Sequence, residues 1–238
     1  MQYQIQKRPS YAVLEVTLNS GEEIQTDPGA MMTRTSAIGN ESSIGGDDGV
    51  MGMAKRAVSD ERGLVENKYY ADGQTGTVTL VPDHPGDIKA INVTEKGPLK
   101  AQSGGLLAWE PLVERSTEFN NRSNMFSSGE LTVLGLSGQG MTFISAYGSM
   151  YEQDVEQGDP LIVDEDHIVA WTDGLSMSRQ KDGSIKSTML GGEGYVTEFR
   201  GDGHVWLQTR NPLALMGGGG GGGGDGSGGG GPSVDDFL

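Results

Sequence analysis

The chain of 238 residues contains no cysteine, which excludes a thiol nucleophile, a thiolate metal site and any disulfide. Long apolar runs are also missing, because no stretch approaches the roughly eighteen apolar residues of a membrane-spanning helix. Residues 1–18 lack a basic segment followed by an apolar core, the pattern of a secretory signal peptide. From the last two absences we expect a soluble, cytoplasmic protein with no membrane span.

Basic residues are scarce: 17 lysines and arginines stand against 33 aspartates and glutamates, for a formal net charge of −16. Such a charge repels polyanions, whereas nucleic-acid binding depends on neutralising phosphates, so no nucleic-acid partner is expected. We interpret the acidity as the surface of a halophilic protein, because high salt screens repulsion between like charges. An acidic face for a basic partner or a cation is the alternative.

Helical periodicity is nearly absent, with one short candidate at residues 50–58. Alternation of apolar and polar residues takes its place and predicts many short strands with one buried face. The clearest runs are Ala12–Leu18, Thr77–Val81, Ile88–Val93, Thr142–Ala146 and His204–Thr209. Glycine, asparagine, aspartate and proline separate them at regular intervals. This pattern predicts an all-β fold of the sandwich or barrel kind.

One phrase occurs three times: clearly at 98–109 (PLKAQSGGLLAW) and 160–171 (PLIVDEDHIVAW), and in degenerate form at 23–34 (EIQTDPGAMMTR). A fixed internal period is the signature of repeated architecture. We therefore predict one domain over residues 1–211, built from three tandem β modules around a pseudo-threefold axis, because a single module cannot bury its own apolar face. The modules span about 2–76, 77–147 and 148–211.

A second phrase repeats within two of these modules, with Gly-Glu followed by Gly-x-Gly, a pattern that fits a tight turn between two strands. Its recurring positions are Gly129, Glu130, Gly138 and Gly140 in one copy, and Gly192, Glu193, Gly201 and Gly203 in the other. Aromatic residues recur too: Trp109 matches Trp171, and Phe143 matches Trp206. We interpret all of these as structural residues rather than paired catalytic carboxylates or an aromatic binding slot.

The phrases at 21–32, 106–109, 163–171 and 192–210 together resemble the Altered-Inheritance-of-Mitochondria twenty-four family. The resemblance covers about residues 2–211. It implies a β fold similar to the tryptophan RNA-binding attenuator protein, of the double-stranded β-helix kind. Prokaryotic members of this family are mostly uncharacterised, and eukaryotic members are tied to mitochondrial organisation. The family offers no catalytic residues to carry over.

Residues 212–238 are expected to form a disordered, glycine-rich tail. Residues 217–231 are glycine except Asp225 and Ser227, so they have almost no side chains for a core. No Lys-Ser/Thr pair follows, which excludes a phosphate-binding loop. The acidic and apolar tip is a candidate docking peptide for a protein partner, formed by Val234, Asp235, Asp236, Phe237 and Leu238. A terminus without a binding role is the alternative.

Few catalytic constellations can be assembled from these residues. The histidines His84, His167 and His204 fall at non-equivalent repeat positions and form no His-x-His pair, which argues against a cupin-type metal enzyme. The loop 164–167 offers three acids and an imidazole to a divalent cation, but such residues are common in turns and segment 102–105 of the second module has no matching ligands. Gly-x-Ser-x-Gly does not occur. We predict no enzyme activity, no metal site and no cofactor.

The function expected from the sequence is that of a binding or scaffold protein, a homo-oligomer joined through strand edges. A metal- or small-molecule-dependent β-helix enzyme is the first alternative, and it requires a solvent-accessible polar pocket around His167 with Asp164 or Asp166. An RNA-binding module is the second alternative. It rests on fold analogy alone and requires a basic stripe.

Overall fold

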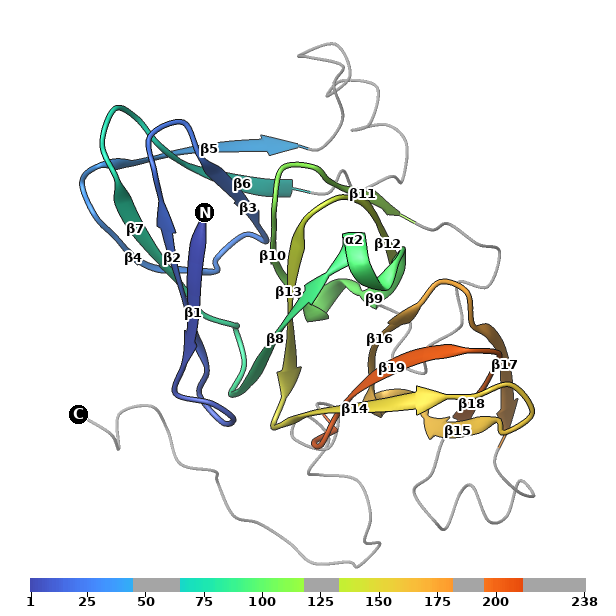
Figure 1. Cartoon of the computed structure of the whole chain (residues 1–238). Coiled ribbons are helices and arrows are strands. Elements are labelled where there is room, and N and C mark those ends of the chain that lie inside the picture. Colours follow the sequence, from blue (N-terminus) through green and yellow to red (C-terminus); the bar gives the residue numbers. More distant parts are fainter. Residues whose placement is uncertain (45–64, 118–132, 182–194, 212–238) are drawn as a thin grey trace, which may run out of the picture.

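The computed structural model describes residues 1–44, 65–117, 133–181 and 195–211 (Figure 1). The predicted helix at 50–58 and the predicted tail at 212–238 lie outside these ranges. Within them, no helix has the length and apolar character needed to cross a bilayer.

The all-β prediction is confirmed. The described helical elements are the one-turn α2 (Val93–Lys96) and two 3-10 turns, η1 (Ser103–Gly105) and η2 (Glu165–His167). The five predicted strands appear within two residues of their expected bounds, as β2 (Val13–Leu18), β7 (Gly76–Leu80), β8 (Gly86–Asn92), β13 (Met141–Tyr147) and β19 (Gly203–Gln208). Alternation sets the burial, since Leu14, Val16 and Leu18 of β2 face the core and the residues between them do not.

The strands form four antiparallel sheets, whose orders are β1-β2-β7-β4, β5-β6-β3-β10-β13-β8, β11-β12-β9-β16-β19-β14 and β15-β18-β17. The remaining strands are β1 (Gln2–Gln6), β3 (Glu23–Thr26), β4 (Met31–Arg34), β5 (Ile38–Ile44), β6 (Val65–Ala71), β9 (Leu99–Gln102), β10 (Leu106–Trp109), β11 (Val113–Thr117), β12 (Val133–Gly138), β14 (Met150–Val155), β15 (Leu161–Asp164), β16 (Ile168–Thr172), β17 (Ser176–Lys181) and β18 (Tyr195–Arg200).

The same pairing order occurs three times along the chain. We call strands β2–β7 unit 1, strands β8–β13 unit 2 and strands β14–β19 unit 3. In each unit the first, sixth and third strands pair in that order, and so do the second, fifth and fourth. The third strand carries the same register shift in every unit, between Met31 and Thr33, Leu106 and Ala108, and Ile168 and Ala170. When the phrases at 23–34, 98–109 and 160–171 are aligned, the three register shifts fall at the same position.

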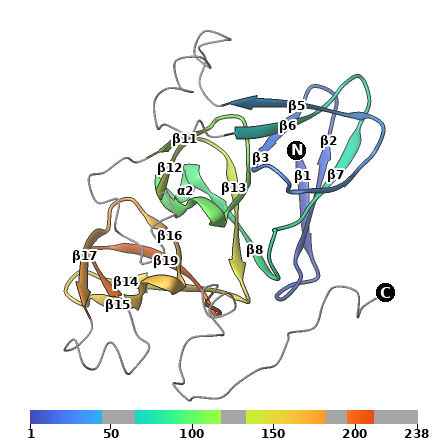
Figure 2. The same cartoon turned by 180° about the vertical axis from the view of Figure 1, so that it is seen from behind.

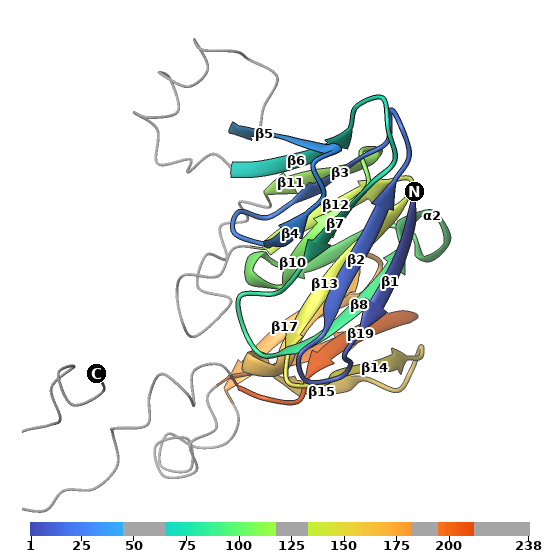
Figure 3. The same cartoon turned by 90° about the vertical axis from the view of Figure 1, so that its left-hand side faces the viewer.

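The units follow one another across the molecule, with unit 1 and unit 3 at opposite ends and unit 2 between them (Figure 1). Figure 2 shows this order from behind and Figure 3 from the side. Pairing of β3 with β10 joins units 1 and 2, and pairing of β9 with β16 joins units 2 and 3. The pseudo-threefold axis and the module boundaries stay predictions; β7 (Gly76–Leu80) straddles the boundary predicted between residues 76 and 77.

Candidate functional site

Two strand edges at opposite ends of the array are the first candidate site. In the described part of the chain, β4 pairs only with β7 and β15 pairs only with β18. The strands at the same places in the other units each pair on both sides, because β10 lies between β3 and β13, and β9 lies between β12 and β16. Each free edge therefore presents backbone N–H and C=O groups that a further strand can pair with.

The side chains of β4 are exposed where their counterparts are buried. Met31 and Met32 are 38% and 52% exposed, although all four residues of β10 and all five of β16 are buried. On the other free edge, Ile162 of β15 is 63% exposed, while Val163 faces the core. Both edges therefore combine unpaired backbone with exposed apolar side chains.

The seam between units 1 and 2 holds a half-buried ion cluster. The guanidinium of Arg115 on β11 donates to Asp27 at 3.2 Å and to Glu66 at 3.1 Å, and it lies 4.4 Å above the ring of Trp109. Desolvation by burial raises the pKa of Asp27 to about 6, although the charge of Arg115 opposes that shift. This cluster fixes the two units against each other.

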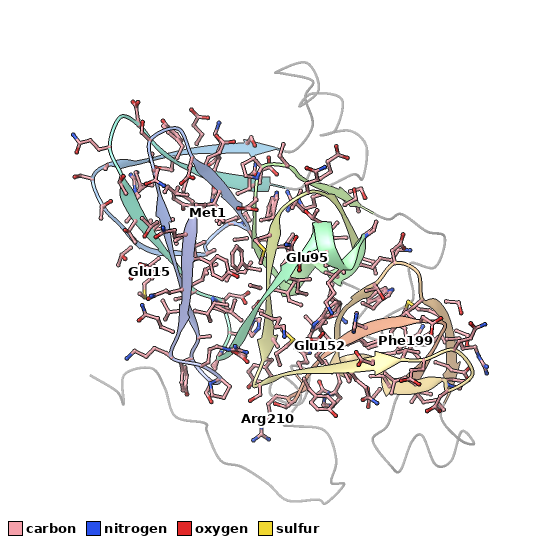
Figure 4. All side chains as sticks on the ribbon, viewed as in Figure 1. Met1, Glu15, Glu95, Glu152, Phe199 and Arg210 are labelled. Carbon is pink, nitrogen blue, oxygen red and sulfur yellow. The ribbon has the colours of Figure 1, made fainter. Side chains whose placement is uncertain are left out.

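A second charged cluster lies between units 2 and 3, where Figure 4 labels Glu152. Ligand atoms of Glu152, Asp154 and His204 lie within 4.8 Å of one another, a spacing that suits a cation. However, Lys89 Nζ lies 2.8 Å and Lys96 Nζ 3.6 Å from Glu152. Burial alone would raise the pKa of Glu152, but the hydrogen bond from Lys89 and the charges of both lysines hold that pKa below its ordinary value. The two ammonium groups already pair with Glu152, and Asp154 lies 2.6 Å from His204 Nδ1, so we interpret the cluster as a structural polar network.

The loop that the sequence offered as a metal site is used structurally. Asp164 accepts a hydrogen bond from the backbone N–H of Asp166 at 3.0 Å, and His167 Nδ1 donates to the carbonyl of Gln208 at 2.6 Å. Glu165 is buried and lies 2.6 Å from Arg179 Nε. Burial raises the pKa of Glu165, and the hydrogen bond from the guanidinium opposes the shift. These side chains therefore bind separate partners and do not converge on one cation position.

The repeated aromatic residues lie inside the sheets. Trp109 and Trp171 occupy matching positions of β10 and β16 and are almost fully buried, and Phe143 and Trp206 are completely buried. Gly138 and Gly140, at the β12–β13 turn, and Gly201, at the β18–β19 turn, have positive φ, whereas Gly203 does not. Gly129, Glu130, Gly192, Glu193 and the tip Val234–Leu238 lie outside the described residues.

Two hollows of the surface are lined by described residues. One, of about 530 Å³, lies beside β4 and is lined by Arg34, Ser36, Ile38, Tyr70 and Asp72 among others. The other, of about 360 Å³, lies where Met1, Glu22, Glu110 and Leu112 meet. Neither is lined by a histidine. The first adjoins the free edge of unit 1, which gives that edge a polar border.

The sequence predicted association through strand edges, but neither the identity of the free strands nor the two ion clusters. The ion partners come from strands far apart in the chain, so no local motif signals them. The free edge has a weak signal, because the degenerate phrase of unit 1 places Thr33 and Arg34 where the other copies have alanine and tryptophan.

Comparison with known proteins agrees with this fold. An uncharacterised protein of Streptococcus pyogenes serotype M6 is 23% identical over 217 residues, which cover 89% of this chain and 86% of that protein. The crystal structure of a Streptococcus pyogenes protein matches with a TM-score of 0.74 at 24% identity, over 91% of this chain and 96% of that one. The family model described as Mitochondrial biogenesis AIM24 matches residues 3–210. The chain therefore belongs to the AIM24 family.

Proposed function

We propose that this chain is a non-enzymatic binding and scaffold protein that acts through the free edges of its sheets. The buried apolar residues of the described chain form three packed clusters in its interior, which supports a structural role for the interior. The largest fully buried side chains, Trp171, Trp206, Phe143 and Phe199, belong to these clusters.

The observation that carries the proposal is the exposure of β4. Met31 and Met32 lie open to solvent, whereas the equivalent Leu106 and Leu107 of β10 are buried, Leu107 within the apolar cluster of the neighbouring unit 1. A strand edge with exposed apolar side chains is a template for another strand. The scaffold function consists of holding a protein partner at such an edge.

The experiment compares the full chain with a Met32→Lys variant, both purified from the native host at its working salt and analysed by native mass spectrometry. Met32 is exposed, so the lysine should leave the fold intact while opposing strand addition. The control is Leu112→Lys, since Leu112 is 69% exposed and lies between β10 and β11 of unit 2, outside both free edge strands.

We expect the wild type and the control to carry protein partners, whether further copies or another chain, and the Met32→Lys variant to lose those bound at β4. A monomeric wild type that retains a stoichiometric metal ion or small molecule would overturn the proposal and favour the enzyme alternative. For that alternative, the described residues bring together Glu152, Asp154 and His204, but Lys89 and Lys96 already pair with Glu152. His84, His167 and His204 contact different partners.

A further inference from the structure

The two free edges are complementary parts of one repeated joint. Within the chain, the second strand of one unit pairs with the third strand of the next, as β3 with β10 and β9 with β16. In the described chain, the second strand of unit 3, β15, has no such partner, and the third strand of unit 1, β4, has none either. The array therefore ends in the two halves of a joint that it forms twice internally.

The apolar clusters are incomplete in the same place. The cluster of unit 1 also contains Leu107, Ala108 and Phe143 of unit 2, and the cluster of unit 2 also contains Ala170 and Trp206 of unit 3. In contrast, among the described residues, the buried members of the third cluster all come from unit 3, with only the partly buried Val133 of the preceding unit packed against them. Unit 3 therefore lacks the cover that each other unit receives from the next.

We infer that a second copy of this chain completes the joint, so that β15 of one copy pairs antiparallel with β4 of the next. This inference rests on the proposed function and names the partner at the edge. The two internal joints fix the register, because Ala170 lies opposite Ala101 in one and Ala108 lies opposite Thr26 in the other.

By equivalence of position, Val163 of one copy lies opposite Thr33 of the next, and Ile162 lies opposite Arg34. Asp164 is then the diagonal neighbour of Arg34, within reach of its long side chain. The exposed Met32 becomes covered, as its counterparts Leu107 and Val169 are, and Ile162 becomes partly covered, as its counterparts Gln25 and Lys100 are.

The partner is a second copy rather than the same chain closing on itself. In Figure 1, β4 and β15 lie far apart at the two ends of the array, and unit 2 lies between them. Because β15 and β4 are different strands at opposite ends of the array, their pairing between copies is a head-to-tail contact, which yields a closed ring or an open filament. The net charge of −16 opposes this contact, so the assembly should strengthen with salt.

The test uses two full-length variants that each block one half of the joint. Ile162→Lys places a charge on the β15 edge, and Met32→Lys places one on the β4 edge. Light scattering after size exclusion, in about 1 M salt to screen repulsion, measures the mass. We expect an oligomer for the wild type and for Leu112→Lys, and 25.1 kDa monomers for each edge variant alone. An equimolar mixture of the two edge variants should form a 1:1 dimer, because one intact half remains on each.

Register is tested by crosslinking, which is specific because the chain has no native cysteine. A mixture of Met32→Cys and Ile162→Cys chains should form a covalent dimer with a short bismaleimide, and a mixture of Leu112→Cys and Ile162→Cys chains should not.

A monomeric wild type at every concentration tested, or edge variants that remain monomeric when mixed, would overturn the head-to-tail assembly. If Met32→Lys nevertheless loses a different protein in the native preparation, the scaffold function stands and only the identity of the partner is wrong. If edge substitutions change neither self-association nor any other bound protein, both proposals fail.

Discussion

Replacing Arg115 by methionine should lower the free energy of unfolding by about 3 kcal/mol near neutral pH. The Arg115 side chain is 5% exposed, and its guanidinium forms ion pairs with Asp27 at 3.2 Å and Glu66 at 3.1 Å. Methionine has a similar volume and retains the contact with Trp109, but it leaves two carboxylates in the seam without their cation. Breaking a buried ion pair costs about 3–5 kcal/mol. The lower end applies because the carboxylate side chains are 33% and 26% exposed and water screens them.

The size of this loss should depend on pH. Burial raises the pKa of Asp27 to about 6 with Arg115 present, and removal of the cation raises it further. Protonation at about pH 5.5 therefore removes much of the repulsion that the variant suffers at about pH 8. Urea unfolding, followed by the fluorescence of the three tryptophans, measures the loss at each pH.

The control for this prediction removes all three charges at once. Combining Arg115→Met with Asp27→Asn and Glu66→Gln should recover most of the lost stability, because a neutral, packed replacement of a buried ion cluster costs little. An equal loss at both pH values, or a triple variant as unstable as the single one, would refute the electrostatic account of the seam.

Three further predictions concern stability. Gly138→Ala should lower the free energy of unfolding by about 2 kcal/mol or more, because φ is +93° and the new Cβ would lie 2.3 Å from the carbonyl oxygen of Leu112. The control, Gly21→Ala, has φ +85° with open space around it and should lose about 1 kcal/mol. Equal urea midpoints for the two variants would contradict the clash at Gly138. Trp171→Ala should cost about 3–5 kcal/mol, checked as a fall in Tm. Asp27 with its raised pKa stabilises the fold when protonated, so the stability of the wild type relative to Asp27→Asn should fall as pH rises from 3.8 through about 6, and a difference constant over that range would count against the shift.

Much of the fold followed from local pattern. Alternation predicted the strands around Val16, Val78 and Phe143, because one-sided burial imposes a period of two. The repeated phrase predicted that β10 and β16 occupy equivalent places, and the shared register shifts agree with this. Burial of Trp109 and Trp171 was predicted because large apolar residues at repeated strand positions pack most often in a core.

The candidate site could not be predicted in the same way. Whether a strand edge is paired depends on which strands meet across units, and no residue of β15 encodes the absence of a neighbour. The ion cluster at Arg115 joins Asp27, which follows β3, with residues of β6 and β11, and such pairings arise only from the folded arrangement. For β4 the sequence carried a weak signal, because the polar Thr33 and Arg34 replace the alanine and tryptophan of the other two phrases at the strand that no further unit covers.

The repeated joint also bears on how such chains vary in length. Because, among the described strands, each unit pairs only with its immediate neighbours, the stability of the array should be a sum of units and junctions. In-frame duplication of residues 86–147 would add one unit and one junction and leave both ends as they are. A complex with a given total number of units could therefore be built from fewer, longer chains, and the same strand joint would serve within and between them.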